Sequence, residues 1–142
     1  QNNLGFCYMN GQGVDQDQSE AVRYYRLSAE QGNAWGQYNL GVCYDNGHGV
    51  AKDLKEAVRY YRLSAEQGDA DGQNDLGYCY QHGQGVAQDL KEAVRLYRLS
   101  AEQGNALGQN SLGYCYQLGQ GIVKDLREAV RYYRLSAEQG NA

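Results

Sequence analysis

The chain has 142 residues, a formal net charge of −4, 42% hydrophobic residues and no proline. Binding to a phosphate backbone depends on clustered, uncompensated lysines and arginines, so an acidic chain disfavours nucleic acid as a partner. No stretch approaches the roughly 18 apolar residues that a membrane-spanning helix needs, so no membrane span is expected.

The sequence repeats itself. Four nearly identical segments begin 36 residues apart, at Leu4, Leu40, Leu76 and Leu112. A period of this length predicts a solenoid in which each repeat buries its apolar face against its neighbours. We expect a single array over residues 1–142, with a partial first repeat at 1–32 and further repeats at 33–68, 69–104 and 105–142. Because the first repeat enters partway through a helix and no polar cap follows the last, we expect the parent protein to continue on one or both sides.

Each repeat is predicted to fold into two helices. In the second repeat, Gly32 can end the preceding helix in the left-handed conformation, and Asn33 can cap a helix that runs from about Ala34 to Asp45. A short glycine-containing loop follows. The second helix of each repeat is expected to start at an aspartate with a glutamate three residues later, at Asp17, Asp53, Asp89 and Asp125.

The residues that stay constant between repeats lie on one side of the first helix. This predicted packing face consists of Gln37, Leu40, Cys43 and Tyr44. Gly41 lacks a Cβ and can let the second helix approach closely. On the second helix, a buried stripe is predicted at Leu54, Ala57, Val58, Tyr61 and Ala65.

The residues that differ between repeats lie on the opposite side of the first helix. They mix aromatic rings with amides, which is typical of binding surfaces, and unconstrained solvent-exposed drift would not favour residues such as Trp35, Tyr78 and Tyr114. We therefore predict a partner-binding surface formed by Phe6, Met9, Trp35, Tyr38, Val42, Asp45, Asn46, Asp71, Asn74, Tyr78, Gln81, His82, Leu107, Asn110, Tyr114, Gln117 and Leu118.

The run LGxxYxxGxGVxxDxxxAxxxYRxxAEQGxAxGQ, which begins at Leu40 and ends at Gln73, strongly resembles the Sel1-like repeat of the tetratricopeptide superfamily. The resemblance covers essentially the whole chain. It implies an all-α fold, a right-handed α-solenoid of stacked antiparallel helix pairs, whose first helices line a concave groove. That placement would put the predicted partner-binding residues in the groove.

Two departures from the family pattern restrict what the resemblance implies. Cysteine-rich members close a disulfide in each repeat with a cysteine on the second helix, whereas this chain has alanine in that region, at Ala29, Ala65, Ala101 and Ala137. Related clamps for C-terminal carboxylates use Lys or Arg in the groove, and none of the groove positions here is basic. The disulfide subtype is excluded and a carboxylate-terminated ligand is disfavoured.

The cysteines occupy one position of the repeat, at Cys7, Cys43, Cys79 and Cys115. Equivalent helices of stacked repeats lie about 8 to 10 Å apart, whereas a disulfide needs Cα atoms within about 7 Å. The cysteines are therefore predicted to be free thiols, which favours a reducing, cytoplasmic compartment.

Catalytic and cofactor sites are not expected. Gly47-His48-Gly49 begins like a dinucleotide fingerprint but follows a helix, and Lys52 stands where the third glycine should be. His48 and His82 have no second ligand at metal-binding spacing, and no base is evident for a serine or cysteine nucleophile.

The second helices carry an arginine ladder and an additional apolar stripe. Glu56 lies three residues before Arg59, and this spacing predicts a solvated ion-pair face in preference to an RNA surface. Tyr60 and Leu63 begin the additional stripe, which is expected to stack against the next repeat in preference to forming an exposed docking surface.

Together these patterns predict a non-catalytic protein–protein interaction scaffold or adaptor that binds a peptide or protein segment on its first helices. The alternative is a structural spacer, or a solenoid that self-assembles end to end through uncapped terminal repeats. An RNA-binding helical repeat is a remote alternative.

Overall fold

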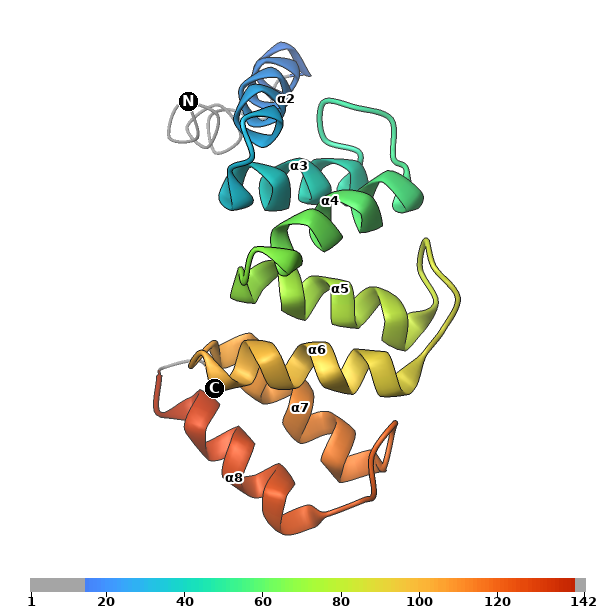
Figure 1. Ribbon diagram of the computed structural model, residues 1–142, viewed down its shortest axis with the longest axis vertical. Helices are drawn as coiled ribbons and strands as arrows, with labels where there is room; N and C mark the ends of the chain where they lie inside the picture. Colours follow the sequence, from blue (N-terminus) through green and yellow to red (C-terminus); the bar gives the residue numbers. More distant parts are fainter. Residues whose placement is uncertain (1–14, 140–142) are drawn as a thin grey trace. The chain divides into compact units, whose positions relative to one another are not determined.

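The structure is a computed structural model that describes residues 15–139, and every regular element within that range is an α-helix (Figure 1). The chain divides into two compact units, Gln1–Gln67 and Gly68–Ala142. The described helices of the first unit are α2 (Asp15–Glu30), α3 (Ala34–Asn46) and α4 (Leu54–Glu66). Those of the second are α5 (Ala70–His82), α6 (Leu90–Glu102), α7 (Ala106–Leu118) and α8 (Leu126–Ala137).

The helix starts follow the predicted capping residues. The side chain of Asn33 accepts a hydrogen bond from the backbone N–H of Gly36 at 2.8 Å, and Asp69 and Asn105 repeat this cap on α5 and α7. Gly32 adopts a φ of 82°, a left-handed conformation that suits glycine. The predicted first helix of the second repeat is confirmed, with its end one residue later than expected.

The second helices start at the predicted aspartates in three repeats. Asp53 Oδ1 accepts from the N–H groups of Lys55 at 3.1 Å and Glu56 at 3.2 Å. Asp125 caps α8 with the same two bonds, and Asp89 caps α6 by accepting from the N–H of Glu92. The prediction for Asp17 is wrong, because α2 already includes Asp15.

The two helices of a repeat are antiparallel. Near one end of the pair, Gln67 Nε2 donates to Gln37 Oε1 at 2.6 Å, while near the other end the N–H of Asp53 donates to the carbonyl oxygen of Tyr44 at 2.9 Å. The predicted packing face lies inside each unit. Leu40 and Cys43 join Tyr25 in the core of the first unit, and Leu112 and Cys115 join Tyr97 in the core of the second.

Within each unit, a loop glycine brings the second of its two repeats against the first. A Cβ on Gly49 would collide with the carbonyl oxygen of Gln18, and a Cβ on Gly121 with that of Leu90. Both glycines also have positive φ, 77° and 70°. Val22 and Val94, which these loops contact, are buried. The glycine-rich loop therefore acts as a packing surface between consecutive repeats.

The additional apolar stripe of the second helices is only partly buried. Its first position is buried, at Tyr60, Leu96 and Tyr132. Tyr60 stacks on Tyr44 of its own repeat, with ring centroids 5.9 Å apart and planes 4° apart. Its second position is 36–40% exposed at Leu27, Leu63 and Leu99. The prediction that the whole stripe stacks against the next repeat is therefore wrong for these leucines.

Helix-face glycines set the distance between the two helices of a repeat. A Cβ on Gly77 would lie 2.8 Å from the ring of Tyr97, which is fully buried, whereas a Cβ on Gly113 would lie 3.1 Å from the ring of the half-buried Tyr133. The ring of Tyr97 has less room to move. A helix pair is consequently less tolerant of a side chain at Gly77 than at Gly113.

Gly77→Ala is expected to lower the free energy of unfolding by about 1–2 kcal/mol, because overpacking outweighs the gain in helix propensity. Gly113→Ala is the matched control and should change stability by less than about 1 kcal/mol, since Tyr133 can shift into solvent. Chemical denaturation followed by circular dichroism measures both. Equal losses in the two variants would contradict this account.

Candidate protein-binding surface

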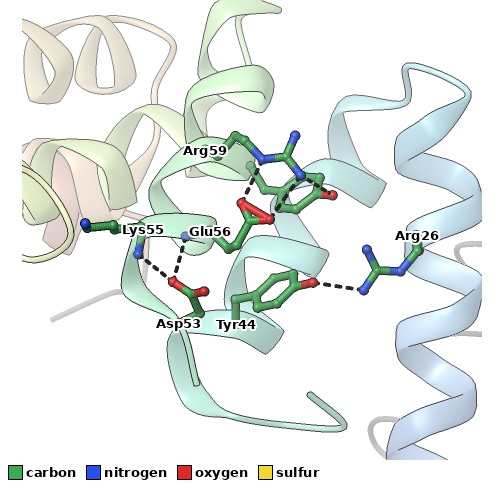
Figure 2. A network of polar contacts seen from close by, with 7 residues as sticks. Arg26, Tyr44, Asp53, Lys55, Glu56 and Arg59 are labelled. Atoms are coloured by element: carbon green, nitrogen blue, oxygen red, sulfur yellow. Dashed lines mark hydrogen bonds and ion pairs between the residues drawn. The ribbon is translucent and has the colours of Figure 1, made fainter. Parts of the chain in front are cut away.

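Arginines of one repeat contact tyrosines of the next. Arg26 of α2 donates to the hydroxyl of Tyr44 on α3 at 2.9 Å (Figure 2), and Arg98 of α6 donates to Tyr116 on α7 at 3.2 Å. Each guanidinium also lies within 6 Å of the ring that it reaches, at 5.8 and 5.9 Å. Part of the arginine ladder therefore connects consecutive repeats.

The other arginines of the ladder form ion pairs within their own helix. Arg59 contacts Glu56 at 2.8 Å (Figure 2), and the same (i, i+3) pair recurs at Arg23, Arg95 and Arg131. The predicted ion-pair face is confirmed. Its arginine side chains are more than half exposed, so each pair contributes little to stability.

Buried polar side chains tie the ends of each helix pair together. Ser100 Oγ donates to the carbonyl oxygen of Ala70 at 2.9 Å, and Ser136 Oγ donates to that of Ala106 at 2.9 Å. Both serines are at most 1% exposed. Sequence reasoning missed this role, although the serine recurs at the same position in every repeat and could have indicated it.

On α4, α6 and α8, a tyrosine donates its hydroxyl to the first helix of the same repeat. The acceptor is Asp45 for Tyr61 at 2.9 Å, Gln81 for Tyr97 at 2.6 Å, and Gln117 for Tyr133 at 2.6 Å. These acceptors belong to the predicted partner-binding surface. The acceptor residue differs between repeats, but each one supplies an oxygen atom. This position of the predicted binding surface therefore also connects the two helices of a repeat.

Two predicted surface residues are in the interior. Asn74 is 8% exposed and accepts a hydrogen bond from Ser111 Oγ at 2.9 Å, and Gln81 is 7% exposed. The prediction that they lie on an exposed face is wrong. Their amides satisfy hydrogen bonds of neighbouring helices, a pairing that helical periodicity within one repeat does not reveal.

In the first unit, the chain's own side chains partly cover the predicted surface. Trp35 packs edge-on against Tyr25 with ring centroids 6.1 Å apart, and Tyr38 lies 5.8 Å from Tyr61. The predicted residues Val42 and Asp45 are half-buried, while Asn46 is exposed and donates to the carbonyl oxygen of Val42 at 3.0 Å. Phe6 and Met9 lie outside the described residues.

The second unit has an open cleft on its first helices. Its volume is about 410 Å³, and it is lined by Tyr78, Gln81, His82, Tyr97, Asn110, Ser111, Tyr114 and Tyr133. Tyr78 is 47% and Tyr114 44% exposed. The hydroxyls of these two tyrosines and the amide of Asn110 make no hydrogen bond with a described residue. The cleft therefore brings together predicted surface residues from α5 and α7 whose polar groups are available to a ligand.

The remaining predicted residues of the second unit lie outside the cleft lining. Leu107 and Leu118 are about half exposed, at 51% and 48%. Asp71 accepts from Asn105 at 3.0 Å, and the exposed Gln117 holds Tyr133. Of these residues, Gln117 supports the cleft through its bond with the lining residue Tyr133.

Within residues 15–139, no three His, Cys, Asp or Glu side chains are grouped to hold a metal ion. Cys43, Cys79 and Cys115 are buried free thiols, as predicted, and Cys7 lies outside the described residues. Burial raises the pKa of Cys43 to about 12 and that of Cys115 to about 11. No helix in the described part of the chain is long and apolar enough to cross a membrane.

The antiparallel pairs, the glycine contacts and the repeated hydrogen bonds define a helical-repeat protein of the α-solenoid class. A Sel1 repeat profile matches residues 1–33, 36–69, 70–105 and 106–141, and the chain belongs to the Sel1 repeat family. Proteins of this family generally act as non-catalytic scaffolds for protein–protein interaction. No curated protein matches the sequence.

Solved structures of Sel1 repeat proteins resemble this one. A Sel1 repeat protein from Oxalobacter formigenes has a TM-score of 0.88 at 39% identity, over 98% of this chain and 57% of the other. A protective antigen of uropathogenic Escherichia coli has a TM-score of 0.88 at 43% identity, over 98% of this chain and 30% of the other. Helicobacter pylori cysteine rich protein B has a TM-score of 0.69 at 25% identity, over 92% of both chains. The chain thus spans 57% or less of the first two proteins, and the all-α solenoid fold is confirmed.

Tyr97→Phe should lower the free energy of unfolding by about 1–2 kcal/mol, because it leaves the buried acceptor Gln81 without its donor. Tyr133→Phe removes the equivalent hydroxyl from an exposed acceptor, which water can replace, so its effect should stay below about 0.5 kcal/mol. Urea denaturation of the two variants provides the comparison. A larger loss for Tyr133→Phe would be inconsistent with the burial of the Tyr97 bond.

The buried thiols should resist alkylation in the folded protein. The thiol of a free cysteine has a pKa of about 8.5, and the thiolate is the form that reacts with alkylating agents. Because the pKa values of Cys43 and Cys115 are raised in the folded protein, both thiols remain protonated at pH 9. The stability that these neutral thiols contribute is fully present below the pKa of the unfolded state. It is lost as the pH rises towards the pKa values of the folded state. Iodoacetamide at pH 9, with sites quantified by peptide mass spectrometry, should label both far faster in urea than in buffer.

Proposed function

We propose that this chain is a non-catalytic binding module whose α5–α7 cleft holds a peptide or protein segment. The observation that carries the proposal is the pair of exposed tyrosines, Tyr78 and Tyr114, at equivalent positions of consecutive repeats in one open cleft. Tyrosine supplies a large contact area at low entropic cost and is enriched among residues that dominate binding energy.

The cleft also provides polar groups for orientation. The amide of Asn110 can both donate to and accept from an extended peptide backbone, and the tyrosine hydroxyls can do the same at the cleft edges. The cleft floor is held by the bond from Tyr97 to Gln81. A rigid floor with available amide and hydroxyl groups above it suits recognition of a segment with little rearrangement.

The experiment is selection of a phage-displayed random peptide library on the immobilised chain, followed by calorimetric titration of the selected peptides. Tyr78→Ala combined with Tyr114→Ala should weaken binding of these peptides at least about tenfold, because both rings contribute contact area. The melting temperature should remain close to that of the unchanged chain, since both side chains are nearly half exposed.

The matched control combines Leu63→Ala with Leu99→Ala, which removes exposed apolar area of the second helices, away from the cleft lining. Peptide affinity should be unchanged in this variant. Peptides that bind both double variants as well as the original chain would locate recognition elsewhere and refute the cleft assignment.

A further inference from the structure

Charge is unevenly distributed over the helices that form the cleft. All lysines and arginines described in the second unit lie on α6, on α8 or in the loop before α8, at Lys91, Arg95, Arg98, Lys124, Arg127, Arg131 and Arg134. Helices α5 and α7 contain none. Helix α5 instead carries two carboxylates, Asp71 and Asp75.

The carboxylate of Asp75 lies near the cleft, because Asn74 links it by hydrogen bonds to Ser111 of the cleft lining. Its carboxylate accepts a hydrogen bond from Asn74 Nδ2 at 3.3 Å on the same helix. Burial is the main cause that raises the pKa of Tyr97, and the charge of Asp75 adds to it. Because the ring of Tyr97 lines the cleft, a group bound there also feels this field.

The exposed tyrosines of the cleft differ from five other tyrosines of the chain. Arginines of the chain itself lie over the rings of Tyr24, Tyr44, Tyr60, Tyr116 and Tyr132, at 4.2–5.9 Å from the ring centroids. No guanidinium from the described residues lies over Tyr78 or Tyr114. One side of the Tyr78 ring lies against His82, with the ring centroids 4.2 Å apart.

We propose that the α5–α7 cleft recognises an arginine or lysine side chain of the bound segment, received over the rings of Tyr78 and Tyr114 in the field of Asp75. The inference rests on the proposed function of the cleft. A cation within about 6 Å of a tyrosine ring is attracted by the negative face of that ring, and the attraction grows when water is displaced. No lysine or arginine among the described residues lines the cleft, so the repulsion that these residues would exert on such a side chain is absent.

The binding mode also defines what is rejected. A carboxylate or phosphate would find no cation on α5 or α7 and would be repelled by Asp75. A neutral side chain of the same shape as arginine would keep the contact area and lose the electrostatic attraction. Citrulline is such a side chain, because it replaces one guanidinium nitrogen with oxygen and carries no charge.

The test titrates the whole chain with two blocked tripeptides, acetyl-Gly-Arg-Gly-amide and acetyl-Gly-citrulline-Gly-amide, at pH 8 and low salt. Ring resonances of Tyr78 and Tyr114, assigned from the Tyr→Phe variants, report binding by NMR. The arginine peptide should shift both rings saturably and bind at least about fivefold more tightly than the citrulline peptide. The preference should shrink in added salt.

A variant without the charge of Asp75 separates the contribution of that charge to binding from the contribution of the tyrosine rings. Asp75→Asn should weaken binding of the arginine peptide about threefold or more without changing that of the citrulline peptide. Glu102→Gln, an exposed carboxylate of α6 outside the cleft lining, is the matched control and should change neither.

Equal shifts by the two tripeptides, or no saturable shift by either, would overturn the cation preference. Library selection then distinguishes the two proposals. Selected peptides whose binding requires both tyrosines but which contain no basic residue would refute the cation preference and leave the peptide-binding function in place. Failure of that function would instead appear as selected peptides that are indifferent to both rings.

Discussion

The close contact between a glycine on the first helix and a tyrosine ring on the second is the constraint on which each repeat depends. At Gly41 and Gly77, an added Cβ would come within 2.8 Å of the ring. The contact sets the spacing of the helices, and that spacing allows the tyrosine hydroxyl to reach its acceptor across the pair, as from Tyr97 to Gln81. The steric fit and the hydrogen bond thus both follow from the position of the tyrosine ring against the glycine.

Contacts between repeats use a different set of groups. Loop glycines such as Gly121 contact the preceding second helix, and arginines such as Arg98 reach tyrosines of the following first helix. Neither set occupies the cleft. Because these contacts between repeats do not use Tyr78 or Tyr114, the residues at these positions of the first helices can differ without disturbing the stacking.

Most of the fold could be predicted from the sequence, since capping residues such as Asn33 and the spacing of core residues such as Leu40 act within a single repeat. The cleft could be predicted only in part. Tyr78 and Tyr114 were identified as surface residues, whereas Asn74 is buried by contacts such as its bond with Ser111, 37 residues away. A helical wheel for one repeat contains no information about the neighbour that covers it.

The acceptor position opposite the buried tyrosine has a consequence for how such an array can change by duplication. Asp45, Gln81 and Gln117 all offer an oxygen that accepts the tyrosine O–H, whereas a lysine or arginine has no acceptor and would leave that O–H without its partner. Every new copy of the unit inherits this restriction together with its fold. An array that lengthens by copying would therefore extend a row of acceptor residues without lysine or arginine along its first helices. The ligands that such an array can come to bind would be restricted by the lack of positive charge in this row.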